Sequence, residues 1–100
     1  MSKEQDDITL PAYYDDLSWR DRIAVRMQYI ILQDQKCYYC NELLAGDPSE
    51  YVTKKIIKWH LFPEGFMKHP IHLQHSHKSG LTEGACHALC NAVMWQFEGR

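Results

Sequence analysis

Apolar side chains in the first third of the chain recur at the spacing of an α-helix. Ser18 followed three residues later by Asp21 resembles a helix N-cap. The apolar positions then repeat every three or four residues as far as Gln33, at Trp19, Ile23, Met27, Ile30 and Ile31. We therefore predict a helix over residues 19–33 that packs through this stripe. Three arginines lie largely off the stripe, which favours a solvated face over a phosphate-binding ridge: Arg20, Arg22 and Arg26.

The pattern changes in the last third of the chain. Residues 71–74 alternate apolar and polar side chains, which predicts a short half-buried strand. Residues 78–80 contain a glycine and predict a turn, after which residues 81–85 can return as a second strand. From His87 onward the pattern is helical, and Gly99 is placed to end this helix. A hairpin followed by a helix is a layout that can hold one metal ion.

The rest of the chain is less regular. Residues 51–59 are strand-like and include three lysines, Lys54, Lys55 and Lys58. Contacts to a phosphate backbone and a solvated strand edge explain these lysines equally well. Residues 61–67 predict an aromatic loop with a turn at Pro63. Residues 1–12 are polar and acidic and predict a flexible tail. We expect a small α+β domain over residues 13–100, with one helix ahead of the hairpin.

Composition limits the classes of protein that fit. A hydrophobic content of 45% argues for a folded chain, and the sequence has no run of about 18 apolar residues that would predict a membrane span. The first residues lack the apolar segment of a secretory signal, so we expect a cytoplasmic, reducing location. The net charge of −2 is not that of a strongly basic nucleic-acid binder. Residues 1–16 carry one lysine against five carboxylates, however, which leaves a charge of +2 on the remainder.

The cysteines and one histidine are spaced like zinc ligands. In a reducing compartment the pair Cys37 and Cys40 favours a metal site over a disulfide. The second pair is either Cys86 with Cys90 or His87 with Cys90, and only the latter repeats the two-residue gap. We therefore favour Cys37, Cys40, His87 and Cys90, and expect Cys86 to be a small buried thiol. Mixed sulfur and nitrogen ligands suit zinc best. Four ordinary reduced cysteines are the weaker alternative.

Several short motifs together resemble the HNH nucleases, which have the ββα-metal fold. They are Gln74-His75-Ser76-His77, the turn at Ser79-Gly80 and the pair Cys90-Asn91, all in register with the cysteine pairs. The similarity is closest to the recombination endonuclease VII-like and small phage HNH branch, and it covers roughly residues 19–99. Each piece alone would be weak, whereas the combined pattern is specific.

The resemblance implies a metal-dependent endonuclease or nickase that hydrolyses phosphodiester bonds of double-stranded or branched DNA. His75 would be the general base that takes a proton from the attacking water. Asn91, with Gln74, would hold a catalytic Mg²⁺ or Mn²⁺, and His77 would assist as a ligand or phosphate contact. The zinc would be structural and would fix the hairpin to the helix. The implied setting is the cytoplasm of a bacterial cell, with the gene of either phage or bacterial origin.

Gln74 departs from the family pattern, which has Asp or His before the general base as a metal ligand. Ser76 and Met94 likewise stand where many relatives have carboxylates. A neutral amide binds a hard cation less well than a carboxylate does, so we expect weak activity unless His72, Glu83 or the substrate phosphate compensates.

Two other functions fit the sequence. One is a zinc module on the same scaffold that binds nucleic acid or protein without cleaving, and the other is an interaction protein that never contacts nucleic acid. Taken singly, His75 would be a structural histidine and Asn91 a residue bonding local backbone at the helix start. We expect Trp95 and Phe97 to be core residues and not a surface for stacking bases.

Overall fold

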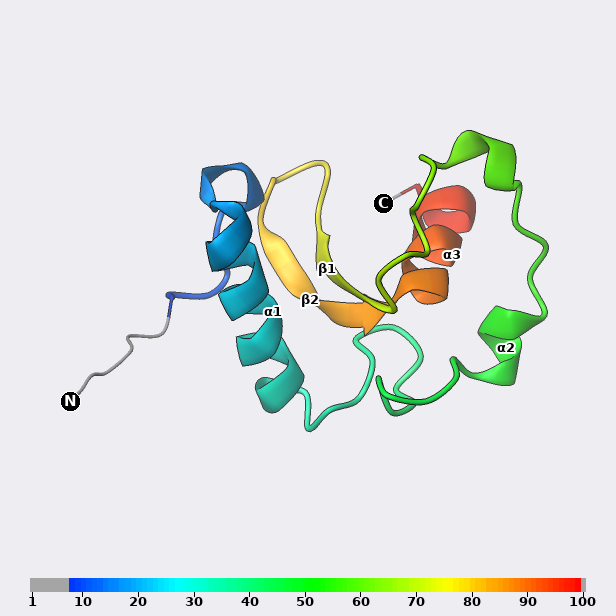
Figure 1. Cartoon of the computed structure of the whole chain (residues 1–100), viewed down its shortest axis with the longest axis horizontal. Coiled ribbons are helices and arrows are strands. Elements are labelled where there is room, and N and C mark those ends of the chain that lie inside the picture. The colour runs from blue at the N-terminus through cyan, green and yellow to red at the C-terminus, as the bar shows by residue number, and fades with distance from the viewer. Residues whose placement is uncertain (1–7, 100) are drawn as a thin grey trace.

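The structure, a computed structural model, describes residues 8–99 of the chain (Figure 1). A two-stranded antiparallel sheet lies between two helices, with α1 packed against one side and α3 against the other. The elements in chain order are η1 (Tyr14–Asp16), α1 (Trp19–Leu32), α2 (Glu50–Thr53), η2 (Trp59–Leu61), β1 (Ile71–His75), β2 (Thr82–His87) and α3 (Ala88–Glu98). The predicted α+β class and the hairpin followed by a helix are confirmed.

The hairpin closes where the sequence predicted a turn. Gly80 has a φ of 80°, a conformation that costs glycine little, and its N–H donates to the carbonyl of Ser76 at 2.8 Å. Ile71 pairs with His87, so β2 runs two residues further than predicted, and the register shifts between Gln74 and His75. Strict alternation would send these two neighbours to opposite faces of the sheet. An irregularity of this kind can change the direction of the side chains next to it.

Helix α1 begins as predicted but does not bury the predicted stripe. The hydroxyl of Ser18 accepts a hydrogen bond from the N–H of Asp21 at 3.1 Å. Val25 and Tyr29 are buried, whereas most of the stripe, including Trp19 and Ile31, is exposed. A polar contact explains the difference. The Tyr29 hydroxyl lies 2.9 Å from the Thr82 hydroxyl on β2, so the face of α1 that carries Tyr29 packs against the sheet.

The outer edge of β2 is covered by the residues that follow α1. The side-chain amide of Gln33 donates to the carbonyl of Ala85 and accepts from its N–H, both at 2.8 Å. The N–H of Tyr38 donates to the same carbonyl at 2.8 Å. Gly84 is needed for this approach, since a Cβ there would lie 2.6 Å from the Gln33 oxygen and 2.7 Å from the Tyr38 ring. These contacts blunt an edge that would otherwise expose unpaired backbone groups.

The strand predicted at residues 51–59 is wrong. Residues Glu50–Thr53 form the short helix α2, and the chain then runs irregularly to η2. The carbonyl of Ser49 accepts from the N–H groups of Val52 and Thr53, each at 3.0 Å, and Val52 is fully buried. Lys54 is the C-cap of this helix and the other two lysines lie in the loop that follows, so none of them lies on a strand edge.

The packed part of the chain begins earlier than predicted. Ile8 exchanges two hydrogen bonds with the side-chain amide of Gln28, at 2.8 and 2.9 Å. The N–H of Ala12 donates to the Thr82 hydroxyl at 3.0 Å, and the N–H of Thr82 donates to the Ala12 carbonyl at 2.8 Å. Residues 8–12 therefore belong to the fold and not to the tail. The rest of the predicted tail, residues 1–7, lies outside the described residues.

Helix α3 supplies much of the small core. Ala92, Val93 and Met94 are buried, and Gly99 ends the helix with a φ of 70°, as predicted. Trp95 and Phe97 are 41% and 51% exposed, so the expectation that they are core residues is wrong. None of the helices within residues 8–99 is long and apolar enough to span a membrane.

Candidate metal centre and the adjoining cavity

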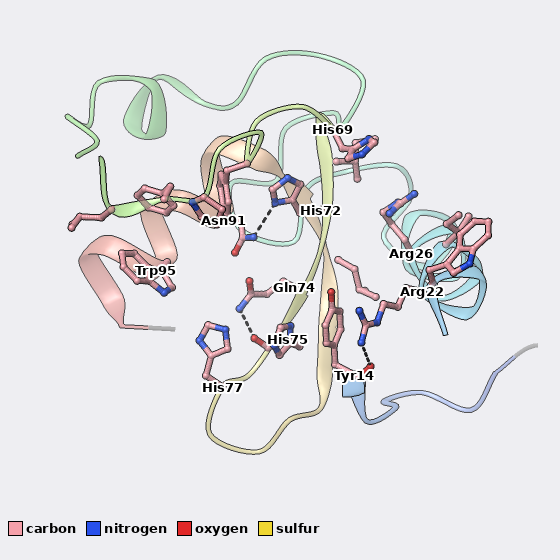
Figure 2. A pocket seen from close by; sticks show the side chains of 18 residues that line it. Tyr14, Arg22, Arg26, His69, His72, Gln74, His75, His77, Asn91 and Trp95 are labelled. Carbon is pink, nitrogen blue, oxygen red and sulfur yellow. Dashed lines mark hydrogen bonds between the residues drawn. The ribbon is translucent and has the colours of Figure 1, made fainter. Parts of the chain in front are cut away.

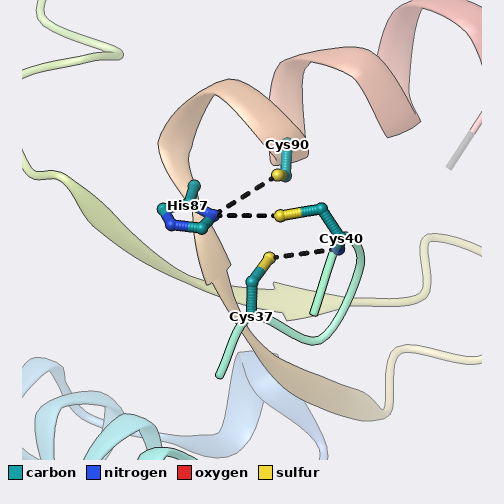
Figure 3. Close-up of side chains that lie close together, drawn as sticks. All are labelled: Cys37, Cys40, His87 and Cys90. Atoms are coloured by element: carbon teal, nitrogen blue, oxygen red, sulfur yellow. Dashed lines mark hydrogen bonds between the residues drawn. The ribbon is translucent and has the colours of Figure 1, made fainter. Parts of the chain in front are cut away.

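Four side chains from three segments converge on one point (Figure 3). The ligand atoms of Cys37, Cys40, His87 and Cys90 all lie within 4.8 Å of one another. His87 Nδ1 is 3.5 Å from Sγ of both Cys40 and Cys90. Around a tetrahedral zinc with bonds of about 2.0–2.3 Å, neighbouring ligand atoms would be about 3.3–3.8 Å apart. The cluster is therefore compatible with a structural zinc ion, and Cys86 is not part of it.

The surroundings of His87 leave its Nδ1, the ring nitrogen nearest the cysteines, free to bind a metal. Its Nε2 lies 2.8 Å from the carbonyl oxygen of Leu43, which can only accept a hydrogen bond. The proton is therefore on Nε2, and the lone pair of Nδ1 points at the thiols. A backbone carbonyl that holds the outer nitrogen of a ligating histidine fixes the orientation of its ring and raises its basicity.

Two thiols of the cluster, Cys37 and Cys90, share a hydrogen bond that shifts their pKa values in opposite directions. A hydrogen bond from Cys90 lowers the pKa of Cys37 to about 4, helped by backbone N–H groups and opposed by burial. The same bond, together with burial, raises the pKa of Cys90. A metal ion would take the place of the shared proton, so its affinity should rise with pH. Burial raises the pKa of Cys86, which is fully buried and stays a neutral thiol.

A cavity of about 920 Å³ lies beside this centre, on the face of β1 (Figure 2). Strand β1 forms its floor, and α1 forms one wall. The opposite wall comes from the aromatic loop and α3, through Phe62, Phe66, Asn91 and Trp95. The volume is at the upper end of the roughly 300–1,000 Å³ typical of ligand sites.

The two predicted cation ligands meet in this cavity. Figure 2 shows the side-chain amides of Gln74, from β1, and Asn91, from α3, directed toward each other. The Nδ2 of Asn91 donates to Nδ1 of His72 at 3.0 Å, and the Nε2 of Gln74 donates to the His75 carbonyl at 2.9 Å and to Glu83 at 3.3 Å. Within the described part of the chain, neither amide oxygen accepts a hydrogen bond. Both oxygens are thus left to a ligand in the cavity.

His72 is well suited to orient Asn91. Burial lowers its pKa, so the ring is neutral near pH 7 and its Nδ1 can accept a hydrogen bond. That bond fixes which end of the Asn91 amide is nitrogen and leaves the oxygen facing Gln74. From the sequence, His72 was considered only as a substitute ligand of the cation. In the structure it instead forms a hydrogen bond with Asn91, one of the two predicted cation ligands.

His75 lies at one end of a stack that continues through Tyr14 to Arg22. Its ring lies on the ring of Tyr14 with centroids 3.9 Å apart and an angle of 10°, and the guanidinium of Arg22 lies 3.9 Å from the same Tyr14 centroid. Two groups at this distance cannot share one face of a ring, so Tyr14 separates His75 from Arg22, as Figure 2 shows. Burial, and then the neighbouring His77, lower the pKa of His75. His77 is exposed and meets His75 edge to face at 4.9 Å.

The prediction from the sequence was wrong for two of the three arginines on α1. Arg22 and Arg26 are half-buried and line the cavity, so the solvated face predicted for them is wrong, while Arg20 is exposed as expected. Their spacing with Trp19 and Ile23, at positions i, i+3, i+4 and i+7, was a visible signal of one helix face. Tyr14 carried no such signal, because its contact with His75 joins segments far apart in sequence.

Comparison of the chain with models of protein families, with curated protein sequences and with solved structures finds no match.

The cluster predicts a dependence of folding on zinc. Cys40→Ser should release the metal and unfold most of the domain, because structural zinc sites contribute about 10–16 kcal/mol of apparent binding free energy. That is comparable to the whole stability of about 5–15 kcal/mol expected for a domain. Elemental analysis and circular dichroism would measure both effects, with Cys86→Ala as the matched control that keeps one zinc per chain. Folded wild-type protein without zinc would contradict the assignment.

The stack predicts a change in the ionisation of His75. Tyr14→Ala should raise the pKa of His75 toward its ordinary value of about 6.5, because water would regain one face of the ring. The pKa is read from an NMR titration of the zinc-loaded protein. Tyr13→Ala is the matched control, since Tyr13 is 59% exposed. An unchanged pKa in Tyr14→Ala would show that the stacked ring does not desolvate His75.

Proposed function

We propose that the chain is an HNH-type endonuclease that hydrolyses phosphodiester bonds of DNA, with its hairpin and α3 acting as a ββα-metal unit. The supporting observation is that Gln74 and Asn91 turn their amide groups toward each other in the cavity that His75 lines. The expected substrate is double-stranded or branched DNA. The expected setting is the cytoplasm of a bacterial cell, with the gene of either phage or bacterial origin.

His75 is the general base of this proposal. Because its pKa is lowered, the ring is neutral near pH 7 and can take a proton from the water that attacks phosphorus. Stacking on Tyr14 holds the plane of the ring, and the neighbouring Gln74 is only 3% exposed, so the end of β1 is fixed. His77, exposed at the rim, contacts a phosphate oxygen of the substrate.

Gln74 and Asn91 are the protein ligands of a catalytic divalent cation. Their oxygens suit a hard cation, and Mg²⁺ commonly keeps several waters and takes only one or two protein ligands together with substrate phosphates. The donor set therefore fits Mg²⁺ or Mn²⁺. When bound, the cation supplies positive charge to the scissile phosphate and to the leaving oxygen.

Glu83 partly compensates for the absence of a carboxylate at position 74. Glu83 accepts a hydrogen bond from Gln74, so a negative charge lies next to the amide without touching the cavity. The bond also directs the Gln74 oxygen forward. Glu83 and His72 thus act as positioning residues, one for each amide ligand. We expect activity below that of a site with a direct carboxylate ligand.

The second candidate function is a module on this scaffold that binds nucleic acid without cleaving it. The observation that favours it is that none of the residues lining the cavity, all within the described range, is Asp or Glu. Plasmid nicking separates the two functions.

The role of His75 predicts the effect of its removal. His75→Ala should lower the rate of plasmid nicking by about 10²–10⁴, the typical contribution of a general base. Zinc content and folding should stay as in the wild type. His60→Ala is the matched control, because His60 is exposed and lies outside the cavity. Nicking by His75→Ala at the wild-type rate would rule out this role.

The charge of residue 74 predicts a change in metal preference. Wild-type nicking should be weak and better in Mn²⁺ than in Mg²⁺, since Mn²⁺ accepts neutral ligands more readily. Gln74→Asp should raise activity in Mg²⁺, because hard cations bind more tightly to charged oxygen ligands. The measurement is nicking against metal concentration.

Gln74→Asn is the matched control for this experiment, since it has the length of Asp without the charge. If Gln74→Asp is no better than Gln74→Asn in either metal, then the missing charge does not limit the site.

A further inference from the structure

One face of α1 combines cationic and apolar residues where it borders the cavity. Trp19, Arg22, Ile23 and Arg26 follow the spacing of a single helix face, and all four line the cavity. Trp19 is 67% exposed and Ile23 is 42% exposed. A face that packed only against protein would bury these two side chains.

The cavity is complementary in charge to a phosphate. Its lining contains two arginines, Arg22 and Arg26, and none of the described lining residues is acidic. The chain as a whole is slightly negative, at −2, so this concentration of cationic groups is local. A cavity lined by one sign of charge raises the local concentration of ligands of the opposite sign.

Arg22 has an unused donor at this place. Its Nη2 donates to the carbonyl of Tyr14 at 3.1 Å, and its guanidinium lies on the Tyr14 ring. Its Nε is buried and has no hydrogen-bond partner. A buried donor of a charged group is costly to leave unpaired. This Nε is closed off from the cavity, so a phosphate in the cavity would meet the guanidinium through its outer nitrogens.

Aromatic side chains lie on both walls of the cavity. Trp19 lines one wall, and the aromatic loop and Trp95 line the other, with Phe62 meeting Trp95 edge to face at 4.9 Å. Bases in a duplex have both faces stacked, so only an unpaired base can offer a face to such side chains. A cationic groove with aromatic side chains is the pattern of single-strand binding.

We propose that the wall of α1 binds an unpaired segment of a DNA strand, with a base against Trp19 and a phosphate at Arg22 and Arg26. The substrate class is then DNA that contains a single-stranded segment next to the scissile bond. This proposal rests on the nuclease function above and narrows its substrate.

The test is fluorescence anisotropy of zinc-loaded protein with a labelled oligothymidylate and with a blunt duplex of equal length, in Ca²⁺ to prevent cleavage. The wild type should bind the single strand more tightly than the duplex. Trp19→Ala should weaken single-strand binding about 5- to 100-fold, the range of one base–aromatic stack. Arg26→Ala should weaken it and reduce the slope of log K against log salt by about 0.7. Both residues are partly exposed, and circular dichroism checks that the variants are folded.

Lys36→Ala is the control for charge, since it removes one cation outside the cavity and should leave binding unchanged. Equal single-strand affinity of Trp19→Ala, Arg26→Ala and the wild type would overturn the proposal, and so would tighter binding of the duplex. Plasmid nicking is measured on the same samples. Nicking with unchanged single-strand binding in both variants overturns only this inference, whereas neither nicking nor DNA binding by the wild type overturns the nuclease function as well.

Discussion

The rest of the structure depends on the convergence of Cys37, Cys40, His87 and Cys90 on one point. The first two ligands follow α1, His87 ends β2 and Cys90 lies in the first turn of α3. A chain of 100 residues buries only a small apolar core, in which most of the largest fully buried side chains are valine or cysteine. A metal at this point would set the angle between the hairpin and α3. It would thereby also fix the distance between Gln74 on β1 and Asn91 on α3.

The cavity shows how a cation site could be built from neutral ligands. Each amide is oriented by a partner behind it, Asn91 by His72 and Gln74 by Glu83. Both bonds are made by the amide nitrogen, so the oxygens remain for a cation. In the proposed site, the electrostatic contribution of a carboxylate ligand would be replaced by the orientation of the two amides and by the charge of Glu83, which does not line the cavity. That exchange favours weak binding of Mg²⁺ and a strong dependence on the substrate phosphate.

Much of the fold could be predicted from local sequence. The cap at Ser18, the turn at Gly80 and the end of α3 at Gly99 each depend on residues within a few positions of one another. The matched cysteine and histidine gaps indicated the metal centre for the same reason. The predictions that were wrong concern contacts between residues far apart in sequence. No local pattern indicated that the Tyr29 face of α1 would pack against the sheet, or that Gln33 and Tyr38 would occupy the edge of β2. The stack of Tyr14 on His75 likewise exists only after the chain has folded.

The most direct test of the account is a crystal structure of the zinc-loaded protein soaked in Mn²⁺, with anomalous scattering used to locate manganese. The account predicts one manganese ion in the cavity, about 2.0–2.2 Å from Oε1 of Gln74 and Oδ1 of Asn91, with waters at its other positions. It also predicts a separate zinc ion among Cys37, Cys40, His87 and Cys90. Well-ordered Gln74 and Asn91 amides with no manganese between them, or manganese bound only elsewhere, would contradict the proposed site.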